Sequence, residues 1–340
     1  MARPHAAALI EDVLHRPVDL VLRRFGWEPR IVPGTGYGAT GFVRVLARVI
    51  LSRQTDAPRP EVAQTRRGWR NFLTSPAVGV PVMVRAGEAV ARTVTDRSGY
   101  VDVVLADHGL APGWHDVSIE VEQRPAVAAP VCVIGPDVTF GLVSDIDDTV
   151  MVTALPRPLI AAWNSFVLHE QARHVVPGMA QLYRELLDEH PGAPIFYLST
   201  GAWNTAPTLS RFLQRHGYPL GPLLLTDWGP TNTGWFRSGQ EHKRESLRRL
   251  ARELPQIRWV LVGDDGQHDP RIYGDFARAH PDLVQAIAIR QLTPGEQVLS
   301  HGLPVANEDF AHHGPRPVPI YRAGDGFGLG RALAAARRAG

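Results

Sequence analysis

The sequence predicts a chain of two domains, in which a parallel α/β domain with helices on both faces of its sheet follows a small antiparallel β-sandwich domain. Three observations favour this organisation. With 340 residues, the chain is too long for one typical domain. Residues 32–135 are rich in β-branched residues and turn signals. Residues 138–290 alternate between strand-like and helix-like patterns, which indicates a parallel sheet.

Composition limits the classes of function. The formal net charge is +2, which gives no electrostatic case for a nucleic-acid partner. The single cysteine, Cys132, excludes a disulfide within the chain and fits a reducing compartment. No apolar run approaches the ~18 residues typical of a transmembrane helix. Charged residues also interrupt the N-terminal apolar pattern where a signal peptide needs an apolar core. We therefore expect a soluble, cytoplasmic protein.

The first part of the chain carries two patterns. Residues 1–31 contain an amphipathic helix, predicted at 5–24, which would pack on the second domain or lie on a membrane surface. Residues 32–136 form the predicted β-sandwich domain, in which short strands alternate with turn signals. These strands are predicted at residues 42–52, 80–84, 91–94, 101–105 and 117–121.

A glycine pattern in this region, Gly36-Tyr-Gly38-Ala-Thr-Gly41, matches the dinucleotide fingerprint G-x-G-x-x-G. That fingerprint requires a strand before the glycines and a helix after them. Here the glycines precede the apparent strand and open no helix. We therefore do not expect nucleotide binding at these residues.

The second domain is predicted at residues 137–293. Its strands are predicted at residues 140–144, 194–199, 222–226, 257–262 and 283–290. Its helices are predicted at residues 177–190, 207–216, 241–254 and 269–280. Residues 294–340 are rich in Gly and Pro, and we interpret them as a tail that packs only in part and ends in a short helix at 328–338.

Chemically active side chains follow three of the predicted parallel strands. In chain order they are Asp145, Asp147, Thr149, Ser199, Asp264 and Asp269. Because open α/β sheets bind ligands at the carboxyl ends of their strands, we expect these side chains to converge at one edge. A polar turn that caps a helix is the alternative for the first three. Strands of soluble proteins avoid Asp, so the aspartates in this short segment need a functional reason.

The chain contains 36 Lys and Arg residues, and Lys243 is the one lysine among them. Chance in an arginine-biased composition is one explanation. A site that accepts only a compact ammonium is the other, because Arg and Lys differ in shape and hydration. Lys243 lies near the start of the helix that precedes the fourth strand, so it would join the acidic residues at the same edge.

Together these residue types suit phosphoryl transfer, in which charge neutralisation dominates. Carboxylates repel a phosphate unless a metal and a cation intervene. Asp145 and Asp264 are hard oxygen ligands suited to Mg²⁺. Lys243 would supply a point charge, and Ser199 would donate a hydrogen bond to a phosphoryl oxygen.

The Asp-x-Asp-x-Thr motif, the strand-end Ser, the Lys and the Gly-Asp-x-x-x-x-Asp motif occur in the order that resembles the haloacid-dehalogenase-like (HAD) phosphatases, over residues 138–290. The resemblance implies a HAD-like parallel sheet. Only about 50 residues separate the first two motifs, so any cap is minimal. The resemblance also implies that Asp145 is the nucleophile that forms an aspartyl-phosphate. Asp147 would be the general acid and then the base.

The same resemblance implies the remaining roles. Mg²⁺ would be bound by Asp145, by the backbone carbonyl of Asp147 and by Asp264, with Asp269 as the supporting acid of this metal set. Thr149 and Ser199 would position the phosphoryl group.

A finer match is also visible. The segments 143–149, 197–203 and 262–270, together with a preceding β-rich domain, look like the actin-patch phosphatidate phosphatase family. That family implies Mg²⁺-dependent conversion of phosphatidate to diacylglycerol. A lipid substrate would be compatible with peripheral contact of this cytoplasmic protein with a membrane surface. The sequence departs from the family in reading Ser-Thr-Gly-Ala-Trp where the family has Ser-x-Ser-Pro-Trp. The shape of the substrate pocket is therefore in doubt.

Two other functions remain open at this point. The enzyme could act on a soluble phosphoester or a phosphoprotein, since a small cap leaves the site accessible to many substrates. Alternatively, the chain could be a catalytically idle scaffold that binds lipid or protein, although an idle site need not keep all of its reactive residues. Trp203, Trp228, Trp235 and the arginine-rich segment 66–72 fit either membrane contact or ordinary packing and solvation. His268, beside the metal loop, is interpreted as a solvated histidine.

Overall fold

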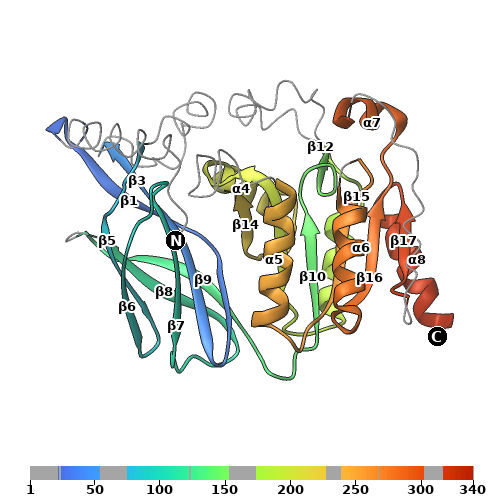
Figure 1. The fold of residues 1–340 in the computed structure, drawn as a ribbon, viewed down its shortest axis with the longest axis horizontal. Coiled ribbons are helices and arrows are strands. Elements are labelled where there is room, and N and C mark those ends of the chain that lie inside the picture. Colours follow the sequence, from blue (N-terminus) through green and yellow to red (C-terminus); the bar gives the residue numbers. More distant parts are fainter. Residues whose placement is uncertain are drawn as a thin grey trace. The chain divides into compact units, whose positions relative to one another are not determined.

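The computed structural model describes residues 22, 24–53, 75–121, 124–152, 174–226, 239–266, 268–301 and 317–339. The chain divides into two units. Among the described residues, the first contains those up to Gly135 together with Ala202–Asn204, and the second contains the others from Pro136 onward. Figure 1 draws the strand-rich first unit and the α/β second unit. Most of the amphipathic helix predicted at 5–24 lies outside the described residues.

The first unit is built on a nine-stranded sheet whose main path runs β1-β3-β2-β9-β8-β5-β6, with β4 and β7 pairing with β3. The strands are β1 (Trp27–Pro33), β2 (Gly36–Ala39), β3 (Phe42–Arg53), β4 (Ser75–Pro76), β5 (Pro81–Ala86), β6 (Ala89–Val94), β7 (Tyr100–Ala106), β8 (Gly113–Val121) and β9 (Val127–Ile134). All pairings are antiparallel except that of β2 with β9. Alternate residues of β3, including Val43, Val45 and Val49, enter the core because side chains alternate across a strand.

The five strands predicted for this region correspond to β3 and β5–β8. The sequence analysis missed β1, β2, β4 and β9 because these strands contain residues that strands usually avoid. Pro29 interrupts β1 and Pro130 interrupts β9. The glycines of the G-x-G-x-x-G pattern fall in and after β2, where a Cβ at Gly38 would collide with the backbone carbonyl of Phe42. Close approach of two strands therefore requires glycine here.

The second unit contains a six-stranded sheet, in the order β14-β13-β10-β15-β16-β17. The strands are β10 (Phe140–Asp145), β13 (Ile195–Ala202), β14 (Leu223–Thr226), β15 (Arg258–Asp264), β16 (Val284–Arg290) and β17 (Ile320–Ala323). The pairings β10–β13, β10–β15, β15–β16 and β16–β17 are parallel. The predicted α/β class with a parallel sheet is therefore confirmed.

Among the described residues, six helices accompany this sheet: α3 (Met179–Asp188), α4 (Ala206–Arg215), α5 (Gly239–Glu253), α6 (Asp269–Ala279), α7 (Pro294–His301) and α8 (Gly326–Ala339). The chain moves from β10 to β13 in one direction, and from β15 to β16 in the other. Right-handed crossovers then place α3 and α4 on one face and α5 and α6 on the other. The contacts agree, because α5 packs against α6 and α3 packs against α8 (Figure 1). The connections after β10 and after β15 therefore lead toward opposite edges of the sheet. Sheets of this kind bind ligands at such a switch point, here between β10 and β15.

The predicted tail supplies two packed elements. Strand β17 extends the sheet beside β16, and α8 packs on α3 with Leu329 and Leu333 buried. The sequence analysis found the helix but not the strand, because β17 has only four residues and no fully buried side chain. A short pair, β11 (Met151–Val152) with β12 (His174–Val175), was also missed.

The residues between β11 and β12, where the predicted minimal cap falls, lie outside the described part of the chain. Within the described ranges, no helix has the length and hydrophobicity that crossing a membrane requires.

The packing of α8 leads to a prediction about stability. Replacing the fully buried Leu329 with Ala should lower the free energy of unfolding by about 2–5 kcal/mol, because the methyl groups lost leave a cavity against α3. Leu220→Ala, at a mostly exposed leucine, is the matched control and should change it by under about 0.5 kcal/mol. Urea unfolding measures both variants. Equal effects would mean that α8 is not part of the folded core.

Candidate active site

Three carboxylates meet at the carboxyl edge of the parallel sheet. Asp145 ends β10, Asp264 ends the neighbouring strand β15, and Asp269 opens α6. The register of β10 and β15 pairs Ser144 with Val262, so the two strands end side by side. All three aspartates are buried, and one carboxylate oxygen from each lies within 4.8 Å of the others. Carboxylates at this spacing can all stay ionised only if a cation lies among them.

Lys243 supplies that cation within the chain. Its Nζ donates to Asp145 Oδ1 at 2.6 Å and to Asp269 Oδ1 at 2.5 Å. The helix α5 delivers it because Lys243, Ser246, Leu247 and Leu250 follow helical spacing and form the buried face of that helix. The ammonium is only 5% exposed. The single lysine of the chain therefore joins two acids from different elements.

Burial and neighbouring charges both shift the pKa values of these groups. Burial raises the pKa of Asp145 well above its usual range, and Lys243 counteracts only part of this effect. Burial also raises the pKa of Asp264, and the charges of Asp269 and Asp145 add to the effect. Burial lowers the pKa of Lys243, but the two carboxylates outweigh burial and the net shift is upward. The ammonium stays charged, and one positive charge does not neutralise three carboxylates.

The donor set fits a divalent cation. Carboxylate oxygens are hard ligands of the kind that Mg²⁺ and similar ions prefer. Asp269 Oδ2 is buried and has no hydrogen-bond partner among the described residues. Asp264 is held in place because its Oδ1 accepts a hydrogen bond from the Gly266 amide at 2.7 Å. Gly263 leaves room for this arrangement, since a Cβ there would lie 2.5 Å from Asp269 Oδ2.

A second pair of predicted residues also meets. Ser199, on β13, donates from its hydroxyl to Asp147 Oδ2 at 2.9 Å. The same hydroxyl accepts a hydrogen bond from the Gly201 amide at 2.9 Å. Ser199 is buried, whereas Asp147 is partly exposed. The serine therefore holds this aspartate in one orientation at the border of the site.

Thr149 is fully buried in the turn after β10, and its Oγ1 has no hydrogen-bond partner within the described ranges. Sequence reasoning missed two residues that fix the start of this turn. Ser144 donates from its hydroxyl to the Asp145 carbonyl at 2.7 Å and lies 2.5 Å from the Tyr183 hydroxyl on α3. The signal was a serine within an otherwise apolar strand. Arg290, at the end of β16, was also missed.

The remaining candidate residues are exposed, have a different contact or lie outside the described residues. His268 is exposed, as predicted for a solvated loop histidine. Trp228, Trp235 and segment 66–72 lie outside the described residues. Asp265 accepts a hydrogen bond from the Leu292 amide at 2.8 Å, which connects the turn after β15 to the segment after β16.

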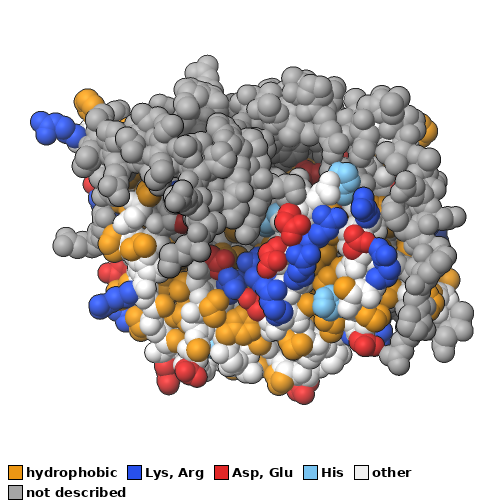
Figure 2. Space-filling model, viewed as in Figure 1, with side chains coloured by type: hydrophobic (Ala, Val, Ile, Leu, Met, Phe, Trp, Pro, Cys, Tyr) orange, Lys and Arg blue, Asp and Glu red, His pale blue; other side chains and the backbone are white. Residues whose placement is uncertain are grey.

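The surface near α5 and α6 differs from the buried site. Figure 2 shows basic and acidic side chains gathered over these helices. Arg248 pairs with Glu241 and Arg252 with Glu245, each at 3.1 Å and exposed. Exposed ion pairs of this kind contribute about 0–1 kcal/mol each. The charged face is therefore solvated, in contrast to the buried cluster of acids.

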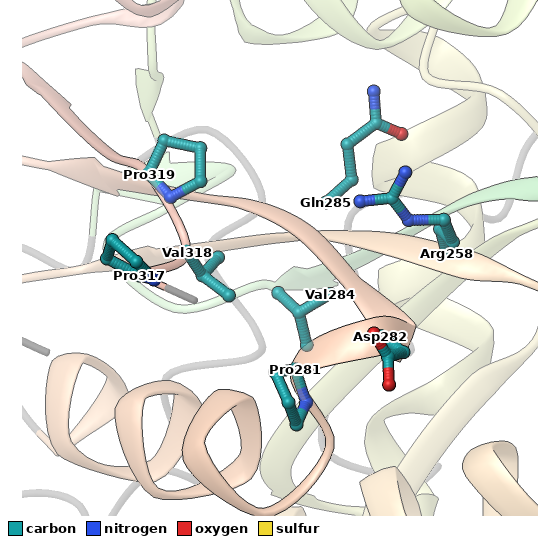
Figure 3. A pocket seen from close by; sticks show the side chains of 8 residues that line it. All are labelled: Arg258, Pro281, Asp282, Val284, Gln285, Pro317, Val318 and Pro319. Carbon is teal, nitrogen blue, oxygen red and sulfur yellow. The ribbon is translucent and has the colours of Figure 1, made fainter. Parts of the chain in front are cut away.

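A cavity of about 390 Å³ lies at the other end of the sheet (Figure 3). It is lined by the first residues of β15 and β16, Arg258 and Val284, and by Pro319 just before β17. The aspartates stand at the opposite ends of these strands. This cavity is therefore separate from the candidate active site.

Comparison with known proteins gives one family. Residues 140–291 match the family model described as the catalytic domain of phosphatidate phosphatase APP1. Phosphatidate phosphatase APP1 of Saccharomyces cerevisiae is 28% identical over 171 residues, which cover 50% of this chain and 29% of that protein. An uncharacterised protein of Schizosaccharomyces pombe is 26% identical over 154 residues, or 45% and 25% of the two chains. The chain thus spans under a third of these relatives.

Solved structures show weaker likeness. The HAD domain of the effector Lem4 from Legionella pneumophila is 16% identical, covers 46% of this chain and 88% of its own, and has a TM-score of 0.32. An uncharacterised protein from Listeria monocytogenes serotype 4b is 13% identical and has a TM-score of 0.34. The match covers 58% of this chain and 99% of that protein's chain. Because both scores are low, the fold described above rests on the strand order of this chain alone.

The buried acids lead to a prediction about pH. Because burial raises the pKa of Asp145 and Asp264, the folded, metal-free protein keeps protons that the unfolded chain releases above about pH 4. Its free energy of unfolding should therefore fall as pH rises from about 5 to 8. Asp264→Asn should make this fall shallower, and Asp137→Asn, at an exposed turn, should not.

Urea unfolding in EDTA at each pH measures this effect. Mg²⁺ added at pH 8 should then stabilise the wild type more than Asp264→Asn, because only a bound ligand shifts the folding equilibrium. The same pH slope in the wild type and in Asp264→Asn would contradict the prediction.

Proposed function

We propose that this chain, whose residues 140–291 belong to the family of APP1-type phosphatidate phosphatase catalytic domains, is a phosphoric monoester hydrolase that uses a divalent metal and an aspartyl-phosphate. The observation that carries the proposal is the buried contact of Lys243 with Asp145 and Asp269, beside Asp264. This cluster combines a nucleophile, a fixed cation and a set of oxygen ligands at one sheet edge. Phosphoryl transfer through an aspartyl-phosphate uses all three.

In the first half of the reaction, Asp145 is the nucleophile. One of its oxygens attacks the phosphorus, and the bond between phosphorus and the ester oxygen breaks. Asp147 donates its proton to the departing alkoxide, so an alcohol leaves. Ser199 supports this role because its hydroxyl bond holds the Asp147 carboxyl group in place.

In the second half, a water molecule attacks the phosphorus of the aspartyl-phosphate, and Asp147 takes the proton from that water. The bond between Asp145 and phosphorus breaks, which releases inorganic phosphate and restores the carboxylate. The same aspartate therefore serves as acid and then as base. Thr149 and Ser199 are proposed to hold the phosphoryl oxygens.

Charge neutralisation comes from two sources. Lys243 is held as a cation by two carboxylates and would face the developing negative charge without needing to reorient. Asp145, Asp264 and Asp269, with the carbonyl of Asp147, would hold the metal, which we propose to be Mg²⁺. When bound, the ion would neutralise charge on the phosphoryl group and lower the pKa values that burial raises in Asp145 and Asp264.

Phosphatidate is the proposed substrate, and diacylglycerol the product, because the matched family and the yeast relative carry that activity in their descriptions. A lipid substrate would bring the enzyme to a membrane surface from the cytoplasm. The changed loop after Ser199, which reads Thr-Gly-Ala-Trp, is the part of the site where specificity is most open to change.

The mechanism is tested by phosphate release from phosphatidate vesicles and from a soluble aryl phosphate. Release should require Mg²⁺, stop with EDTA, and fall to background in Asp145→Asn because the amide is not a nucleophile. Asp137→Asn, at an exposed turn, is the control and should match the wild type. Hydrolysis that survives both EDTA and Asp145→Asn would refute the mechanism. Turnover of the aryl phosphate alone would refute the lipid substrate.

The single lysine gives a second test. Lys243→Arg keeps the positive charge, but a planar guanidinium cannot take the place of the ammonium between Asp145 and Asp269. We expect kcat to fall by about 100-fold with the fold retained, as judged by circular dichroism. Arg244→Lys, the reverse change at the next residue of α5, should have no effect. A Lys243→Arg variant with wild-type turnover would show that any cation suffices.

A further inference from the structure

Arg290 ends β16 at the same edge of the sheet as the acids. The register of β15 and β16 pairs it directly with Asp264. Its side chain is buried, with 4% exposed, although arginine is among the residues that proteins rarely bury. None of the roles proposed above uses this guanidinium. A buried charge beside a catalytic edge needs a reason.

All three guanidinium nitrogens of Arg290 have partners. Nη1 donates to the Asp148 carbonyl at 2.7 Å, Nη2 to Glu296 Oε1 at 2.6 Å, and Nε to the Gly324 carbonyl at 3.2 Å. The planar guanidinium fixes the directions of these donors relative to one another. Arg290 therefore ties the turn after β10 to α7 and to the segment after β17.

The partner of Nη1 lies between two proposed site residues. Asp148 follows Asp147 and precedes Thr149, and it is buried in the left-handed region with φ of 58°. This backbone conformation costs a non-glycine residue about 1–3 kcal/mol and persists only where surrounding contacts enforce it. The bond from Arg290 to the Asp148 carbonyl is such a contact.

Glu296 fixes the other side of the guanidinium. Its Oε2 accepts hydrogen bonds from the Thr293 amide at 2.8 Å and the Thr293 hydroxyl at 3.0 Å, which forms a capping box at the start of α7. Burial raises the pKa of Glu296, but the bonds from Arg290 and Thr293 outweigh burial, so the net shift is downward. The glutamate is therefore anionic and orients the guanidinium toward the turn.

We propose that Arg290, oriented by Glu296, is a positioning residue that holds the Asp148 carbonyl and so fixes Asp147 and Thr149 in their working geometry. The proposal rests on the hydrolase function proposed above for its effect on rate, but not for its effect on the turn. The competing explanation is that Arg290 only neutralises the buried Glu296. Because Glu296 is only partly buried, that role needs a positive charge but not a fork of donors.

Arg290→Lys separates the two explanations, because it keeps the charge and loses the fork. If Arg290 positions the turn, kcat should fall by about 100-fold while KM changes by less than about threefold, since the chemical step and not substrate binding is disturbed. Arg258→Lys, at the opposite end of the adjacent strand β15, is the matched control and should leave both unchanged. Wild-type kcat in a folded Arg290→Lys, or a change confined to KM, would overturn the proposal.

Hydrogen exchange tests the same claim without any substrate. The amides of Asp148, Val150 and Met151 all bond within the turn. In Arg290→Lys the peptide covering 146–151 should exchange at least about tenfold faster, and in Arg258→Lys it should not. Faster exchange with an inactive wild type would refute the hydrolase and keep the positioning role. Unchanged exchange would refute the positioning role whatever the activity.

Discussion

The buried contact of Lys243 with Asp145 and Asp269 is the interaction on which the rest of the candidate site depends. Each partner requires the others, because a buried carboxylate without a cation takes up a proton and a buried ammonium without carboxylates loses one. Removing one partner from such a group typically costs about 3–5 kcal/mol, since a charge is left unpaired. The contact therefore fixes the position of the proposed nucleophile and offsets part of the effect that burial has on its pKa.

The sheet topology brings these groups together from distant parts of the chain. Asp145 and Lys243 are 98 positions apart, yet β10 and the helix leading into the adjacent β15 bring them to one edge. Because the connections after β10 and β15 lead toward opposite edges of the sheet, space opens between these two strands at that edge. The neighbouring strand β16 contributes Arg290 to the same edge, so three successive strands of the sheet surround the turn that carries Asp147 and Thr149.

Much of the second unit could be predicted from sequence, because its central strands are continuous apolar runs. Two of the site's aspartates stand at the ends of these runs. Asp145 and Asp264 were predicted for this reason. Lys243 was predicted because it is the single lysine in the sequence. Arg290 was not found, because one arginine among many gives no sequence signal until its partner Glu296 is known. Strands β2 and β17 were not predicted. Both have only four residues, and β2 also contains two glycines, so neither shows the alternation of a strand. Pairing with neighbouring strands determines that these segments are extended.

The central claim is that Asp145 carries the phosphoryl group during turnover. The most direct test mixes the enzyme with phosphatidate and Mg²⁺, quenches it within a turnover, and reduces the protein with borohydride. Reduction converts an aspartyl-phosphate into homoserine, which mass spectrometry locates in the sequence. Substrate-dependent homoserine is expected at position 145 and nowhere else. Homoserine at another aspartate, or rapid phosphate release with unmodified Asp145 at every quench time, would contradict it.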